Sequence, residues 1–319
     1  MKRYLSFFPI AWALLFAALV LNGCAQEGTS GDPELPVGDT AATAPTETAP
    51  NSNAFRYLWK LQAGYSWKVK SQENRTIVYY PGTAKEEQEK YTISLNRKMN
   101  LRNIDKEFAM NLGVFVQDVV VDHTGKGGDW KFNSAAPDSK PDPDGFSALV
   151  GKEFSVRMDG GPGQILDVKG AEAIYKDRGK PELVELGNAL MREQLNDEFY
   201  IYPDGPTEVG ATWERTGRLR DPYGLEATHK FELEKRMNDQ GFLQRTTEYT
   251  PGTPIAALHP EGHQYQLSGT ATASFNVEDA TGLVYSRVQN TRLSGTLQTD
   301  GKEIPVQVEV ALISEMSLK

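Results

Sequence analysis

Two histidines are the first residues whose type and spacing could do chemistry. His259 and His263 lie four positions apart and flank Glu261 in the segment His259-Pro-Glu-Gly-His263. On a helix, this spacing would present two imidazoles to one metal ion. Pro260 and Gly262 favour a loop instead, and no third ligand is evident. We therefore predict a solvated loop without metal or cofactor, and His259 and His263 remain the alternative metal ligands.

An acidic loop offers a second, calcium-like pattern. Residues 138–145 read Asp-Ser-Lys-Pro-Asp-Pro-Asp-Gly, whereas an EF-hand requires Asp-x-Asp-x-Asp-Gly and a closing Glu. Lys140 stands at the first required acidic position, and Gly151 stands where the Glu belongs. We predict a polar loop from about Thr124 to Gly145; a lid over a cavity and disorder are both open readings.

The sequence lacks the motifs of several common enzyme classes. It contains no Walker A loop, no Rossmann glycine fingerprint and no Gly-x-Ser-x-Gly nucleophile elbow. His123 and His229 lie in or beside strand-like segments, where packing explains them. A hydrolase with paired carboxylates is a distant alternative, because acidic residues are abundant but no spacing selects a pair. We predict a protein that is not an enzyme.

The single cysteine, Cys24, has the setting of a lipid-modification site. An uncharged run from Tyr4 to Val20 follows two basic residues and leads into Leu21-Asn-Gly-Cys24. A basic start, an apolar stretch and small residues at the junction are typical of a removable export signal. The ending resembles a bacterial lipobox, in which the cysteine thiol is acylated, although Asn22 replaces the commoner Ala or Ser. A plain cleaved signal and a retained membrane helix are the alternatives.

Composition divides the chain into three parts. Residues 1–23 are the predicted lipoprotein signal peptide. Residues 24–54 are rich in Thr, Ala and Pro, so they bury little apolar surface, and we predict a disordered tether. Residues 55–319 form the predicted β-rich globular domain, either whole or as two halves of about 55–200 and 201–319.

The charge balance argues against one class of partner. The 319 residues contain 34 Lys and Arg against 43 Asp and Glu, which gives a net charge of -9 and a sequence pI near 5.1. Nucleic-acid binding calls for basic patches, so we expect no nucleic-acid partner.

Cys24 has no cysteine to pair with in the chain, so stability must come from a hydrophobic core.

Alternation of apolar and polar residues dominates the folded region. It is clearest in residues 89–99 and 306–312, and Phe108, Met110 and Leu112 repeat the same period. Such patterning with one polar face predicts antiparallel strands. Further strand candidates are residues 66–70, 76–80, 152–158, 227–235, 243–249, 264–277 and 284–293.

One segment departs from this pattern. Residues 170 to about 196 have helical character, in two pieces divided near Gly179–Pro181. Leu183, Leu186, Leu190 and Leu195 would lie near one face. We predict an α+β fold, mainly antiparallel β: a curved sheet or sheets, or a barrel-like sandwich of two similar halves, with one helical segment packed on it.

The two halves share a weak likeness. Gly64-Tyr-Ser-Trp67 opens the first, and Gly210-Ala-Thr-Trp213 opens the second. Each half later has a Phe-x-Val strand, a turn containing glycine and another apolar strand. Internal duplication and chance are both open explanations.

A series of short structural motifs resembles a known family. In chain order the motifs are Leu61-Gln-Ala-Gly-Tyr-Ser-Trp-Lys-Val69, Leu149-Val-Gly-Lys-Glu-Phe-Ser-Val156, Gly163-Gln-Ile-Leu-Asp-Val-Lys-Gly170, Val209-Gly-Ala-Thr-Trp213, and Leu267-Ser-Gly-Thr270 with Thr281-Gly-Leu283. This order is similar to that of bacterial envelope proteins grouped as domain of unknown function 6263, over roughly residues 58–316. The resemblance implies no reaction, cofactor or catalytic residue.

Aromatic residues give the sequence its candidate ligand site. They crowd the start of the predicted domain, and one opens the second half: Tyr57, Trp59, Tyr65, Trp67 and Trp213. Such rings could line a pocket for an apolar ligand, or simply pack within the sheet. We expect a lipid-anchored envelope protein, periplasmic or extracellular and on the outer membrane rather than the inner. Its expected function is to bind or carry a lipid-like ligand or envelope component, and a structural or assembly role is the alternative.

Overall fold

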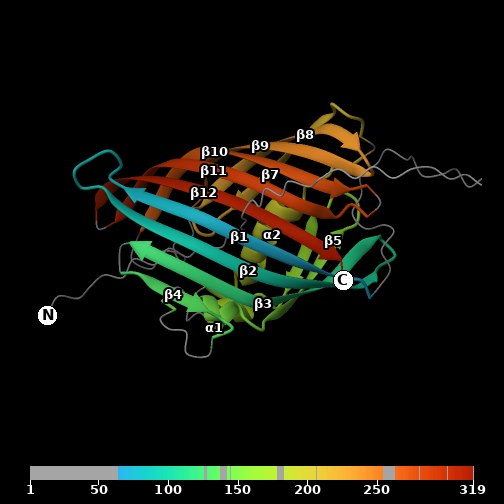
Figure 1. Cartoon of the computed structure of the whole chain (residues 1–319), viewed down its shortest axis with the longest axis horizontal. Coiled ribbons are helices and arrows are strands. Elements are labelled where there is room, and N and C mark those ends of the chain that lie inside the picture. Colours follow the sequence, from blue (N-terminus) through green and yellow to red (C-terminus); the bar gives the residue numbers. More distant parts are fainter. Residues whose placement is uncertain are drawn as a thin grey trace, which may run out of the picture.

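The computed structural model describes most of the chain from Gly64 onward. The described ranges are 64–125, 128–136, 142–143, 145–177, 183–205, 207–253, 263–279, 281–299 and 301–318. They form one open, curved, antiparallel 12-stranded sheet with a helical segment on its concave side (Figure 1). The predicted fold class is therefore confirmed, and the sheet is continuous.

The first six strands occupy one side of the sheet and the last six the other. The first set is β1 (Ser66–Tyr79), β2 (Glu87–Ile104), β3 (Ala109–Gly125), β4 (Trp130–Asn133), β5 (Glu153–Asp159) and β6 (Ile165–Lys169). The helices follow or interrupt them: η1 (Phe146–Leu149), α1 (Glu172–Asp177) and α2 (Gly187–Phe199). The second set is β7 (Thr212–Leu219), β8 (Leu225–Met237), β9 (Gln240–Pro251), β10 (Gln264–Glu278), β11 (Val284–Thr299) and β12 (Lys302–Leu318).

The strand order shows how the chain builds the sheet. The order is β6-β5-β3-β2-β1-β12-β11-β10-β9-β8-β7, and β4 pairs with β3. From β1 at the centre, the described chain moves strand by strand to one edge, crosses through α1 and α2, and returns from the other edge to the centre. All pairs are antiparallel and most join sequence neighbours. Two pairs join strands that are not sequence neighbours: β3 with β5, and β1 with β12, which closes the middle of the sheet.

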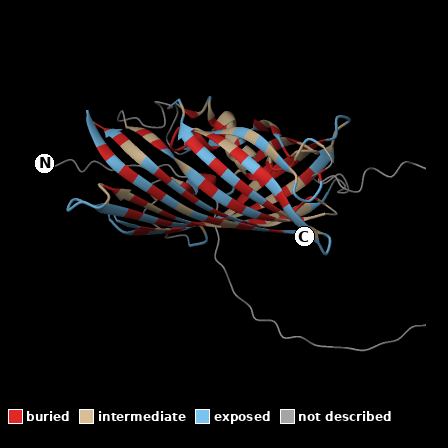
Figure 2. Cartoon of the chain, turned by 90° about the horizontal axis from the view of Figure 1, so that it is seen from above, coloured by how far each residue is buried: buried red, intermediate tan, exposed pale blue. Residues whose placement is uncertain are grey.

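Each strand buries one face, as the sequence alternation predicts. Figure 2 shows buried and exposed residues in regular succession along the strands. In β12, for example, Val306 and Val308 are buried, whereas Gln307 and Glu309 are exposed. Because successive side chains in a strand point to opposite faces, this pattern puts the apolar residues on the concave side. The core therefore lies inside the curve of the sheet.

Helix α2 lies inside that curve and contacts both edge strands, β6 and β7. Asn196 Oδ1 accepts a 2.8 Å hydrogen bond from the backbone N–H of Ile165, so a helix side chain satisfies a group on the β6 edge. Near β7, Arg220 Nε donates to Glu193 Oε1 at 2.7 Å. An unpaired strand edge is a site for unwanted pairing, and α2 covers part of both edges.

The structure corrects three details of the sequence prediction. Residues 66–70 and 76–79 belong to one strand, β1, because buried polar residues continue the alternation between them, and Tyr80 lies just beyond its end. Phe108 is 78% exposed with a φ of 59°, so it lies in the β2–β3 turn and off the strand face. The polar loop from Thr124 to Gly145 contains strand β4 in its described part. The predicted helical segment is confirmed as α1 and α2.

No helix among the described residues combines the length and apolar character that crossing a bilayer requires.

Candidate functional site

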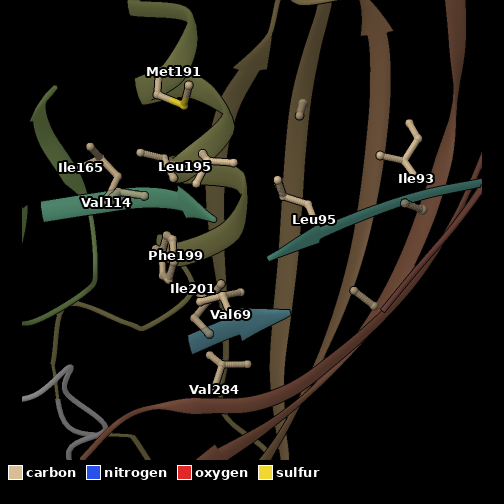
Figure 3. Packing of buried hydrophobic residues seen from close by; sticks show 14 of the residues in the cluster. Val69, Ile93, Leu95, Val114, Ile165, Met191, Leu195, Phe199, Ile201 and Val284 are labelled. Atoms are coloured by element: carbon tan, nitrogen blue, oxygen red, sulfur yellow. The ribbon is translucent and has the colours of Figure 1, made fainter. Parts of the chain in front are cut away.

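A cavity of about 140 Å³ lies between α2 and the concave face of the sheet. Most of its lining is apolar and comes from β2, β3, α2 and β11, including Ile93, Leu95, Val119, Met191, Leu195 and Leu293. Figure 3 shows the α2 and β2 members of this set in the same interior. For scale, an engineered apolar cavity of about 150 Å³ stays dry and binds benzene. The space therefore suits one ring or part of one acyl chain.

Two adjacent acidic residues at the end of α2 form part of this lining. Glu198 accepts hydrogen bonds from both terminal nitrogens of Arg97 on β2, at 2.6 and 3.0 Å. Asp197 pairs with Arg287 on β11 at 2.7 Å and with Arg245 on β9 at 3.1 Å. All these arginines are buried. These ion pairs thus connect the C-terminal end of α2 to β2 in the first set of strands and to β9 and β11 in the second.

Asp197 is the centre of a larger buried cluster with Arg245, Arg287, His229 and Gln289. Burial alone would raise the pKa of Asp197, but the two arginines hold it well below its usual range. Burial, and then Arg245, lowers the pKa of His229 to about 3. The His229 Nε2 lies 3.7 Å from Asp197. The histidine is therefore neutral near neutral pH, and the carboxylate is charged.

A second buried ion pair lies on β1, where Glu73 contacts Arg75. Both side chains point to the concave face, two residues apart. Burial raises the pKa of Glu73 to about 7, and Arg75 only partly offsets that effect. Arg75 lines the cavity, whereas Glu73 is beside it. The charge state of Glu73 therefore changes near neutral pH.

Several donors on the cavity wall have no hydrogen-bond partner within the described part of the chain. They are Arg75 Nε and Nη1, Arg287 Nε and Nη1, Arg97 Nε and Gln194 Nε2. Leaving a buried donor unsatisfied costs about 1–3 kcal/mol, and such groups are uncommon in folded proteins. The wall is therefore suited to a ligand that brings acceptor oxygens.

Of the aromatic residues predicted to line a ligand site, the described ones, Tyr65, Trp67 and Trp213, do not border this cavity. Trp67 is buried in the main core, and Tyr65 is partly exposed beside it. Trp213 stacks on Phe231, with ring centroids 5.5 Å apart, and donates its indole N–H to the Ile201 carbonyl. Tyr57 and Trp59 lie outside the described residues, as does Cys24. Trp67 and Trp213 thus pack within the domain, whereas Tyr65 is partly exposed.

The sequence did not predict the charged residues that line the cavity, because no local motif indicates them. One signal was available in β1: Ser71, Glu73 and Arg75 occupy every second position between Val69 and Ile77. Strand periodicity puts all five on one face, so the sequence places charges on a core face. The same reasoning applies to Arg287 and Gln289 in β11.

The two histidines kept as alternative metal ligands fall partly outside the described chain. His263 is described, but His259 lies outside that part, together with most of the acidic loop 138–145. Among the described residues, no group of three or more His, Cys, Asp and Glu side chains could hold a metal ion.

Comparisons with known proteins connect part of this site to a family. Residues 184–284 match a family of unknown function, DUF6263. The match supports the predicted resemblance over that segment. The DUF6263 segment contains α2 with Asp197 and Glu198, as well as Arg245, but neither Arg75 nor Arg287. No curated protein matches the sequence significantly.

Solved structures give distant likenesses. A lipovitellin structure, described by its lipid–protein interactions, matches 81% of this chain and 25% of its own, with 11% identity and a TM-score of 0.47. OccK11 (OpdR) of Pseudomonas aeruginosa matches over 82% and 100% of the two chains, with 8% identity and a TM-score of 0.17. The outer membrane protein opdK from the same organism matches over 80% and 99%, with 7% identity and a TM-score of 0.14. This chain thus spans 25% of the lipovitellin chain, and at these TM-scores the likenesses support no functional conclusion.

The Arg97–Glu198 pair gives a stability prediction. Arg97→Met leaves Glu198 buried without its partner, so we expect a loss of about 3–5 kcal/mol in unfolding free energy. The double variant Arg97→Met with Glu198→Met removes both charges and should recover most of that loss. Urea unfolding of the three proteins measures the difference. Equal losses in the single and double variants would show that the ion pair is not what the single variant disrupts.

His229 gives a pH prediction. The folded chain keeps it neutral down to about pH 3, whereas the unfolded chain protonates it near the ordinary value of 6.5. Acidification therefore favours the unfolded chain as pH falls below 6.5. Between about pH 7.5 and pH 5, the wild type should lose about 2 kcal/mol more stability than His229→Gln.

Glu73 acts in the opposite direction over the same range. Its raised pKa favours the folded state at low pH, and that contribution is lost as pH rises through about 7. Because both proteins contain Glu73, this effect cancels when their urea unfolding curves are compared. Parallel pH profiles for the wild type and His229→Gln would contradict the buried, neutral state of the histidine.

Proposed function

We propose that this protein is a non-enzymatic binding or carrier module for an apolar, lipid-like ligand. The observation that carries the proposal is the cavity of about 140 Å³ between α2 and the sheet, with apolar walls and buried donors. Pockets for small molecules typically combine mostly apolar walls with a few polar groups that fix orientation. The dimensions favour one chain or ring over a bulky polymer.

The surface does not favour the alternative assembly role. Large exposed apolar residues in the described part are scattered over different elements: Tyr65, Phe108, Val120, Val209, Met237, Val288 and Leu318. An assembly surface would gather such residues into one patch. A ligand inside the curve of the sheet is the better-supported role.

The proposal places the module at the cell envelope, with acyl chains on Cys24. Its support is the signal-like start of the sequence and the lipobox-like residues before Cys24. Two or more acyl chains bind a bilayer lastingly, because each buried methylene contributes about 0.8 kcal/mol.

A cavity-filling substitution tests the binding role. Leu95→Trp introduces an indole into the β2 wall and should weaken binding of 1-octanol at least about tenfold, by removing the space for it. Leu293→Phe fills the β11 part of the lining with a smaller side chain and serves if Leu95→Trp fails to fold. Val120→Trp, on the exposed face of β3, is the matched control. Calorimetry of the full chain in lipid nanodiscs, with empty nanodiscs as blank, gives the affinities; unchanged binding in both cavity variants would exclude this cavity as the site.

The anchor is tested separately. Cys24→Ala removes the thiol that would be acylated, so we expect the protein to keep its leader and to lose its acyl mass. Mass spectrometry of the wild type purified from membranes would report the acylated terminus together with any bound lipid. A wild-type protein without acyl chains would end the anchor proposal and leave the cavity proposal standing.

A further inference from the structure

Only some of the N–H groups of one arginine on the cavity wall have a partner among the described residues. Arg75 is 2% exposed and borders the cavity. One of its terminal nitrogens pairs with Glu73, while Nε and Nη1 have no partner among the described residues. Tyr223 also lines the cavity, and its hydroxyl interacts with Arg75.

We propose that the cavity binds a single-chain carboxylic acid, with the carboxylate at Arg75 and Tyr223 and the chain along the apolar walls. This inference rests on the proposed function and names its ligand class. An N–H group of the Arg75 guanidinium can donate to a carboxylate oxygen, and such charge-assisted bonds are stronger than neutral ones. The phenolic O–H is a further donor to the same group.

Charge and size together select this ligand. The charged side chains that border the cavity are balanced: Arg75, Arg97 and Arg287 against Asp197, Glu198 and Asp221. A phosphate, with up to two negative charges, would meet uncompensated repulsion from these acids. The volume also excludes a ligand with two full acyl chains unless the cavity opens. One chain with one carboxylate fits both limits.

Arg287 is a poorer anchor although it also has free N–H groups. Its Nη2 donates to Asp197 at 2.7 Å and also to Gln289. Asp197 is charged and close, so it repels an incoming anion, and its low pKa prevents neutralisation near pH 7. Arg75, by contrast, pairs with a carboxylate that can take up a proton.

That partner is Glu73. Burial raises its pKa to about 7, and a ligand carboxylate next to Arg75 would raise it further, because like charges disfavour ionisation. Glu73 then takes a proton from solvent, and Arg75 exchanges one carboxylate for another. Besides Arg75, the groups around this pair are Tyr79 on β1, Tyr91 and Glu89 on β2, Tyr223 before β8 and Tyr265 on β10. Burial raises the pKa of Tyr79, Tyr223 and Tyr265, so these three stay neutral in the working range.

The test compares octanoate with 1-octanol, two probes with the same chain length. Calorimetry with the full chain in nanodiscs should give a wild-type affinity at least about tenfold higher for octanoate. Arg75→Met should remove this excess and leave the affinity for 1-octanol within about twofold. Glu73→Gln with Arg75→Met, which carries no buried charge at these positions, is the second variant in case the single one is unstable. Each probe partitions into the nanodisc bilayer to the same extent for every variant, so this contribution cancels when the variants are compared.

Two further readouts separate recognition from a structural role. Octanoate affinity of the wild type should fall between about pH 6 and pH 8.5 as Glu73 ionises, and Glu73→Gln should abolish that dependence. With carboxyl-labelled octanoate, carbon NMR should show a bound pKa below that of free octanoate in the wild type. In Arg75→Met it should lie above the free value, because burial without the cation disfavours ionisation.

The outcomes are distinguishable. If 1-octanol binds but octanoate binds no more tightly, or if Arg75→Met weakens both alike, the carboxylate inference fails and the proposed function stands. If neither probe binds the wild type, the proposed function fails as well. Tighter octanoate binding that depends on Arg75 supports both.

Discussion

The interior of this protein depends on how one helix end is held inside a curved sheet. Carboxylates near the C-terminal end of a helix face the negative end of its dipole, which is unfavourable. In α2, Asp197 and Glu198 occupy that position and are buried as well. Only the arginines from β2, β9 and β11 make this arrangement stable. The same contacts set the distance between α2 and the sheet, and so the space between them.

The path of the chain explains why this helix is needed. Each set of six strands ends at an edge, and the segment that joins the two edges must cross the concave side. There α2 buries Met191, Leu195 and Phe199 against the sheet and covers exposed strand edges (Figure 3). A sheet this wide could curl on itself or pair with another chain. The segment that contains α1 and α2 instead packs on the concave side of the sheet. A cavity remains where its side chains do not reach the strands.

Sequence reasoning found the framework and missed the site, for one physical reason. Strand alternation is a local signal, so β2, β10 and the helical segment could be placed closely from residues alone. The cavity combines side chains from strands far apart in sequence, such as Arg75 and Arg287, and no local motif links them. Polar residues on the inner face also hid the middle of β1, because alternation was sought in apolar residues only. The aromatic residues were chosen for their size, but Trp67 and Trp213 pack within the domain and Tyr65 is partly exposed.

The buried charges are difficult to explain by stability alone. Replacing a buried ion pair with apolar residues of similar volume is often neutral or stabilising, so a core of this size has no energetic need for Glu73 and Arg75. N–H groups on Arg75 and Arg287 that have no partner among the described residues make the cost larger. A ligand that supplied acceptor oxygens would remove that cost on binding, since the donors are already desolvated and fixed by neighbouring carboxylates. An amphipathic molecule would satisfy both the apolar lining and these donors.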